Sequence, residues 1–136
     1  MTRIAFLLMA FWAGSLWTVC GIVAPSLFAV LEDRRIAGQL AGRFFHIETA
    51  IGVVIGAVLL ALSFAGKLQL PGRQWVAITA VLPLTSYVVL SPLMATARAS
   101  GNMARFGMLH GISAILFFGA CLSAAMMLWR FSRPAE

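Results

Sequence analysis

The stretch FFHIETAIGVVIGAVLLALSFAG, residues Phe44–Gly66, decides the fold of this chain. Its 23 residues exceed the roughly 20 that a helix needs to cross a bilayer, and only His46 and Glu48 interrupt its apolar character. Three further runs of similar length contain no Asp, Glu, Lys or Arg: residues 4–31, 74–97 and 106–129. The sequence therefore predicts four membrane-spanning helices.

The composition supports the same class of protein. Of the 136 residues, 62% are hydrophobic and only 10% are charged, and the mean hydropathy is +0.98. A soluble domain is roughly half apolar and a quarter charged. Nine of the 14 charged residues lie in three short connecting segments, residues 32–43, 67–73 and 98–105. Because short loops join neighbouring helices, we expect an all-α, up-down-up-down four-helix bundle that forms one integral membrane domain over residues 1–136.

Two other interpretations of the sequence are disfavoured. Arg3 precedes the first apolar run as in a signal peptide, but this run is about twice as long as a signal core and lacks a small-residue cleavage site. The net charge of +6 would favour a nucleic-acid partner in a soluble domain. In a membrane protein, however, arginines anchor the ends of the spans. We expect a multi-pass protein of the bacterial cytoplasmic membrane, surrounded by lipid and without a nucleic-acid partner.

Small residues recur at helical spacing in three of the four apolar runs. In lipid, such residues let helices approach closely and supply much of the contact energy. They are Gly14, Gly21 and Pro25 in the first run, Gly52 and Gly56 in the second, and Gly107 and Gly111 in the fourth. We expect them to pack helices within the chain; the alternative is contact with a second copy or with a partner membrane protein.

The third apolar run contains Pro83 and Pro92. Each proline removes a backbone hydrogen bond, so we expect the helix to be kinked. The hydroxyls of Thr85, Ser86 and Ser91 are near enough in sequence to bond the freed carbonyl groups.

Polar side chains gather in one half of the predicted bundle. The second and fourth helices begin at the same end, which places His46, Glu48 and His110 at similar depths. Ionisable groups in lipid cost roughly 2.5 to 3.5 kcal/mol each, so they favour the bundle interior or the interface. The candidate ligand-binding cluster in this half consists of His46, Glu48, Tyr87, Ser91, Arg98, Arg105 and His110. Because His46 and Glu48 are two residues apart in a helix, we expect Glu48 to face a close neighbour beside Gly52 while His46 faces elsewhere.

Three hypotheses compete for this cluster. In the first, Glu48 pairs with Arg98 or Arg105, and the cluster is structural. In the second, His46, His110, Cys20 and Met94 bind copper(I), which prefers imidazole, thiolate and thioether ligands. In the third, His46 and His110 hold a haem between two helices, or a proton relay runs through Glu48.

These hypotheses lead to different functions. We expect metal or small-molecule handling, including transport across the membrane. The alternatives are a structural or accessory subunit without its own ligand and a haem-binding redox protein. No catalytic array, phosphate-binding loop or pair of carboxylates occurs in the sequence, so we do not expect an enzyme.

The two cysteines are predicted to stay apart. Counted along their helices, Cys20 lies in the half nearer the first loop and Cys121 in the opposite half. At a rise of 1.5 Å per residue their depths differ by roughly 10 Å, too far for a disulfide.

The sequence resembles the transmembrane protein 205-like family of small four-span proteins across all four predicted spans. The resemblance rests on short motifs around the first and third loops, which include Ala24, Pro25, Phe28, Ala37, Gly38, Gly42, Phe45, Arg98, Arg105, Phe106, His110, Gly111 and Ser113. It implies the four-span fold. Vertebrate members are linked with tolerance to platinum drugs, so the resemblance also implies metal or small-molecule handling.

Overall fold

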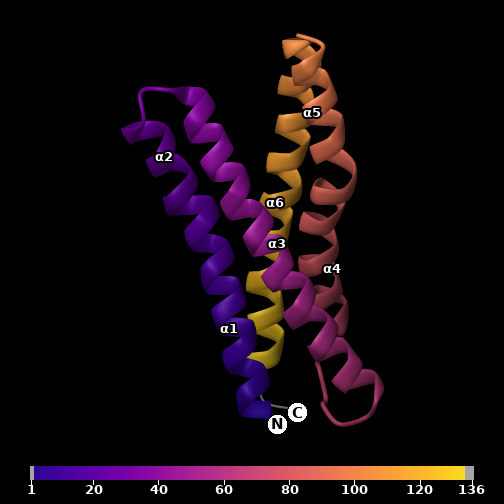
Figure 1. Ribbon diagram of the computed structural model, residues 1–136. Coiled ribbons are helices and arrows are strands. Elements are labelled where there is room, and N and C mark those ends of the chain that lie inside the picture. The colour runs from indigo at the N-terminus through magenta and orange to yellow at the C-terminus, as the bar shows by residue number, and fades with distance from the viewer. Residues whose placement is uncertain (1, 134–136) are drawn as a thin grey trace.

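The computed structural model describes residues 2–133, and these form four antiparallel helical spans (Figure 1). The first span consists of α1 (Thr2–Thr18), the π-helical turn η1 (Val19–Val23) and α2 (Ala24–Val30). The second is α3 (Arg34–Phe64), and the third joins α4 (Arg73–Thr85), the π-helical turn η2 (Ser86–Leu90) and α5 (Ser91–Ala99). The fourth is α6 (Met103–Ser132). All four are long and apolar enough to cross a membrane, so the predicted all-α four-helix bundle is confirmed and the chain is a multi-pass membrane protein.

Helix α3 begins ten residues before the apolar run that predicted it. Its first residue is Arg34, and the Asp33 side chain caps it by accepting hydrogen bonds from the backbone N–H groups of Arg35 (2.8 Å) and Ile36 (3.2 Å). An apolar run marks only the part of a helix that lies in hydrocarbon. The polar first turns of α3 therefore extend beyond that run, where the sequence predicted a loop.

The half of the bundle near the chain termini is packed around Trp12. This side chain on α1 is 1% exposed and lies against α3. A Cβ atom built at Gly52 would lie 2.6 Å from Trp12 Nε1, and one at Gly56 would lie 3.1 Å from the Cβ of Ala80 on α4. The glycines of α3 thus let α1 and α4 approach it from two sides, as expected from their spacing.

The other predicted packing residues do not make such contacts. Nothing lies within 4 Å of a Cβ built at Gly14, Gly21, Gly107 or Gly111, and Pro25 is exposed. The expectation that they pack helices within the chain was wrong. Helices α1 and α6 bury other faces, whose larger side chains make the contacts: Met9, Trp12 and Leu16 on α1, and Leu109, Phe117 and Met127 on α6. The sequence analysis also missed Gly119, where a Cβ would lie 3.1 Å from Leu82 of α4.

The half of the bundle away from the termini is divided into two diverging pairs of helices. There α2 packs against α3, and α5 packs against α6, while the two pairs separate (Figure 1). Each π-helical turn precedes a divergent segment, and each is followed within two residues by a proline, Pro25 or Pro92. Such turns bend a helix, as prolines do. The predicted kinks of the third span thus take the form of η2, between Pro83 and Pro92.

Two of the three hydroxyls near these prolines, those of Thr85 and Ser86, have other partners than we expected. Thr85 Oγ1 donates to the carbonyl of Val81 at 2.8 Å, and Ser86 Oγ lies 2.6 Å from Ser113 Oγ of α6. Ser86 therefore joins two helices and does not bond a carbonyl freed by proline.

The predicted separation of the two cysteines was also wrong. Cys121 is buried in a cluster against which Cys20 packs, and the two free thiols lie close together. Trp17 Nε1 also donates to the carbonyl of Cys121 at 3.1 Å, which ties α1 to α6 at this level. The tip of the α5–α6 pair extends further than that of the α2–α3 pair (Figure 1). Depths counted from the two loops therefore start from different levels.

The glycine contacts predict opposite effects of the same substitution at two positions. Gly52→Ala is expected to lower the free energy of unfolding by about 1 to 3 kcal/mol, because the new methyl group overlaps buried Trp12. Gly14→Ala, the matched control in an open position, is expected to leave stability unchanged or to raise it by up to about 1 kcal/mol through helix propensity. Thermal unfolding in detergent measures both. Equal effects at the two positions would contradict the packing described here.

The cysteine contact predicts an intramolecular cross-link. Treatment of the purified protein with diamide is expected to oxidise Cys20 and Cys121 to a disulfide, because neighbouring thiols need little backbone movement to bond. Peptide mapping without reductant detects the bond, and Cys20→Ser is the control that must abolish it. Two free thiols after oxidation of the folded protein would instead support the depths predicted from the sequence.

Candidate ligand cavity

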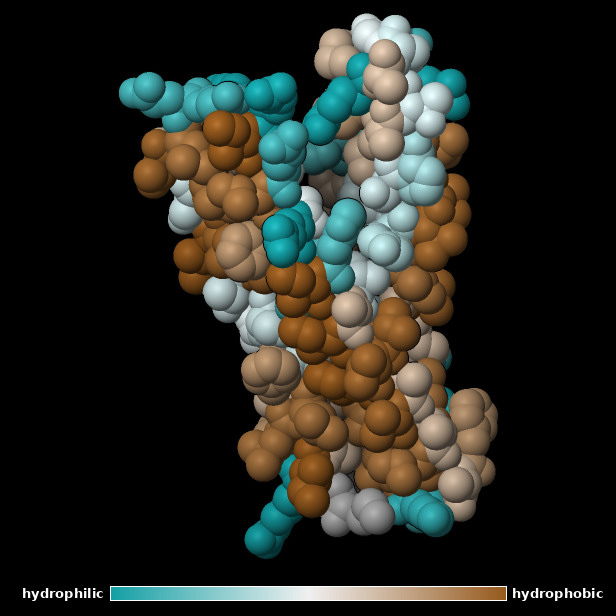
Figure 2. Space-filling view, viewed as in Figure 1, coloured by the Kyte–Doolittle hydropathy of each residue, from teal (hydrophilic) through white to brown (hydrophobic). Residues whose placement is uncertain are grey.

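A cavity of about 630 Å³ lies between the two diverging pairs of helices. Its walls come from α2 and α3 on one side and from η2, α5 and α6 on the other. Figure 2 shows the corresponding notch, with hydrophilic residues on both of its sides, whereas the opposite half of the molecule is mostly hydrophobic in this view. The cavity occupies the half of the bundle in which the sequence placed the polar cluster.

Helical spacing brings the lining residues together. On α6 they follow one stripe, Phe106, His110, Ser113, Ala114 and Phe117. Because residues three and four apart share a face of a helix, this whole stripe faces the cavity. Four residues selected in the sequence analysis line the wall formed by η2 and α5: Tyr87, Ser91, Met94 and Arg98.

Arginines supply the charge of the cavity. Arg34, Arg43 and Arg98 line it, and the Arg98 guanidinium lies 4.5 Å from the ring centroid of Phe106. Arg105, which the sequence analysis included, is not among the lining residues. Across residues 2–133, none of the three carboxylates lines the cavity. The cavity is therefore positively charged without an internal counter-ion.

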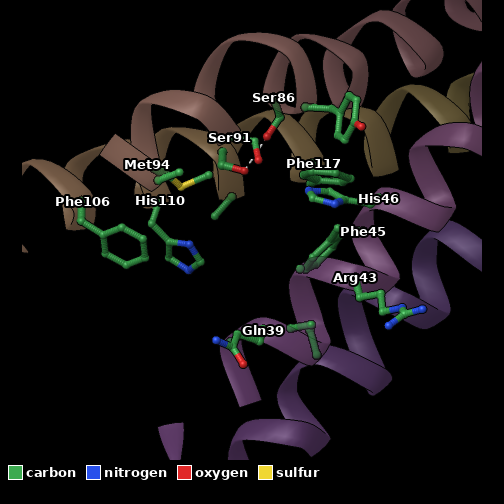
Figure 3. Close-up of a pocket in the computed structure, with 18 of the residues that line it drawn as sticks. Gln39, Arg43, Phe45, His46, Ser86, Ser91, Met94, Phe106, His110 and Phe117 are labelled. Atoms are coloured by element: carbon green, nitrogen blue, oxygen red, sulfur yellow. Dashed lines mark hydrogen bonds between the residues drawn. The ribbon is translucent and has the colours of Figure 1, made fainter. Parts of the chain in front are cut away.

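The two histidines line opposite walls. His46 of α3 packs edge-on against Tyr87 of η2, with ring centroids 4.8 Å apart, and His110 of α6 stacks near Phe106 at 6.0 Å. In Figure 3 His110 lies beside Met94, while His46 lies beside Phe117. The structure thus brings His46, His110 and Met94 to one cavity, as the sequence analysis expected.

Aromatic rings and hydroxyls form the deep end. Phe45 of α3 and Phe117 of α6 contact one another with centroids 4.5 Å apart, and Phe117 belongs to the buried cluster around Cys121. Ser86 lies at the same wall as Ser91 (Figure 3), and its Oγ is 2.6 Å from that of Ser113, which also lines the cavity. The floor is therefore apolar, with a few hydroxyls that already have a partner.

Glu48 faces away from the cavity. It is 3% exposed and accepts a hydrogen bond at 3.0 Å from Ser15 Oγ of α1. The expected opposition of His46 and Glu48 is therefore observed. The suggested pairing of Glu48 with Arg98 or Arg105 was wrong, because the orientation of α3 turns this carboxyl toward α1.

The predicted copper ligands are only partly together. Cys20 is not a lining residue, because η1 turns it toward Cys121. Within residues 2–133, no group of three or more His, Cys, Asp or Glu side chains is placed to hold a metal ion. The sequence analysis missed Arg34, Arg43, Phe45 and Phe117 as lining residues. Spacing could have found three of them, since Arg34, Gly38, Phe45 and Thr49 share one face of α3 and Phe117 continues the stripe of α6. Arg43 lies on the other side of α3 from Arg34, so spacing gives no such signal for it.

Comparison with known families gives one match. Searches against curated proteins and against solved structures return no match. The profile of the family described as a domain of unknown function, DUF4149, matches residues 7–103. This segment covers the first three spans, including the walls of the cavity formed by α2, α3, η2 and α5. The chain therefore belongs to the DUF4149 family.

Proposed function

We propose that this protein binds an anionic, amphipathic small molecule in its cavity, within the bacterial cytoplasmic membrane. The observation that carries this proposal is the placement of Arg34, Arg43 and Arg98 in a largely apolar cavity that no described carboxylate lines. All three side chains are exposed, so their guanidinium groups are available to an anion that enters the cavity. A bound anion would supply the missing counter-charge.

The chemistry of the side chains supports the same ligand class. A guanidinium group offers planar, paired donors that match a carboxylate or a phosphate. Low polarity around the site strengthens this attraction relative to bulk water. Phe28, Phe106 and Phe117 offer apolar surface for the rest of the molecule.

Binding is better supported than passage across the membrane. The deepest lining residues are Thr49 of α3 and Phe117 of α6, and the buried clusters around Leu16 and Trp12 fill the bundle beyond them. Transport would require these clusters to open. The resemblance to the transmembrane protein 205-like family supports small-molecule handling in general, and we include membership of this family in the proposal.

The charge requirement is tested by a matched pair of arginine variants. Arg98→Gln is expected to remove most of an anionic molecule that copurifies with the wild-type protein, because it loses a cation in the cavity. Arg73→Gln is the control: Arg73 lies 5.4 Å from the ring centroid of Phe64, does not line the cavity, and should retain the ligand. Native mass spectrometry of the protein released from detergent measures ligand occupancy. Equal occupancy in both variants would contradict the proposal.

The same samples test the metal alternatives. His46, His110 and Met94 line one cavity, so copper or haem iron is the specific competitor. Elemental analysis for iron, copper and zinc is expected to find less than one metal ion per chain. A stoichiometric metal that disappears in His110→Ala would overturn the proposal in favour of a metal site.

A further inference from the structure

We infer that the ligand is a single-chain anionic lipid, with its head group at the arginines and its acyl chain along the cavity toward Phe117. This inference rests on the proposed function and specifies the ligand class. Three features of the cavity support the inference: the order of charged and apolar side chains along it, its length and volume, and its access to the bilayer.

Two of the three arginines that line the cavity are separated from its apolar end. The third, Arg43, lies two residues from Phe45, and its side chain points away from the other labelled residues in Figure 3. Arg34 is the first residue of α3, and Arg98 lies in the last turn of α5, so both cations lie at the ends of spans, where lipid head groups reside. Phe45 and Phe117 lie more than two helical turns further in. A lipid has the same order, with its charge at the interface and its chain in the hydrocarbon layer.

The length of the cavity matches one leaflet. From Arg34 to Thr49 the wall of α3 rises about 22 Å, and from Phe106 to Phe117 the wall of α6 rises about 17 Å, at 1.5 Å per residue. Half of a bilayer, with its polar region, measures about 20 to 22 Å. A molecule that fills the cavity therefore spans a single leaflet.

The volume favours one acyl chain. The cavity holds about 630 Å³. At about 30 Å³ for a water-sized group, the cavity has room for roughly 20 such groups. This number suits one long chain with a small anionic head. A lipid with two such chains would need more than this volume.

The cavity is open to its surroundings. Tyr87 and Phe28 line it and are 48% and 41% exposed, although both belong to membrane-spanning helices. An opening at this depth faces lipid. A ligand can therefore enter from the leaflet without leaving the membrane.

Binding to the full-length purified protein in a non-ionic detergent tests the inference with defined probes. Palmitate is expected to bind at one molecule per chain. Octanoate should bind about fourfold more weakly for each missing methylene that lies in the cavity. Hexadecanol has the same chain without the charge, and it should bind at least about tenfold more weakly than palmitate. Titration followed by native mass spectrometry gives the three affinities.

A substitution within the cavity tests the position of the chain. Ala114 lines the wall of α6, so Ala114→Leu is expected to weaken palmitate binding by about tenfold while changing octanoate binding less. Ala125→Leu is the matched control, since Ala125 is exposed on the same helix and does not line the cavity. It should leave both affinities unchanged.

The outcomes separate this inference from the proposed function. Equal affinity for palmitate and octanoate, or tighter binding of diacyl phosphatidylglycerol than of palmitate, would overturn the single-chain lipid. Binding of 2-naphthoate that depends on Arg98 but not on Ala114 would also overturn it, while the proposed function would stand. Absence of any anion whose binding depends on Arg98 would overturn both.

Discussion

The contact of Trp12 with the glycines of α3 is the constraint on which the rest of the structure depends. Helices in lipid gain no hydrophobic energy by associating, so close packing must hold them together. A large indole against Gly52 and Gly56 provides such packing between α1 and α3, and Ala80 brings α4 to the same place. With one half of the bundle held in this way, the other half can diverge without loss of the fold. The cavity exists because packing is concentrated at one end.

Two polar contacts between helices strengthen the packed half of the bundle. Ser15 donates to Glu48 between α1 and α3, and Thr79 Oγ1 lies 2.7 Å from Ser123 Oγ between α4 and α6. Buried polar groups need partners, and in lipid the alternative is an unsatisfied group. These contacts specify which faces of the helices meet. They also explain why the carboxyl of Glu48 is absent from the cavity, since its partner lies on α1.

The sequence was sufficient for the fold class because hydrophobic length is a direct signal of a span. It also placed His46, Tyr87, Ser91, Met94, Arg98 and His110 in one half of the bundle, and all six line the cavity. Contacts between helices were harder to predict. Gly14, Gly107 and Gly52 look alike in sequence, but only the last lies opposite a large side chain. The pairing of Cys20 with Cys121 depends on the unequal heights of two helix pairs, and a count of residues cannot measure these heights.

The two arginines that the sequence analysis missed show what hydropathy cannot predict about α3. Arg34 and Arg43 lie outside the second apolar run, so hydropathy assigned them to a loop. The cap at Asp33 and the strong helix-forming residues after it extend α3 through this segment instead. Because Arg34 lies on the face of α3 that also carries Phe45 and Thr49, the continued helix places this cation above side chains that lie deeper in the membrane. The stripe from Arg34 to Thr49 therefore combines interfacial charge with apolar depth in one wall, which is the arrangement that an amphipathic anion requires.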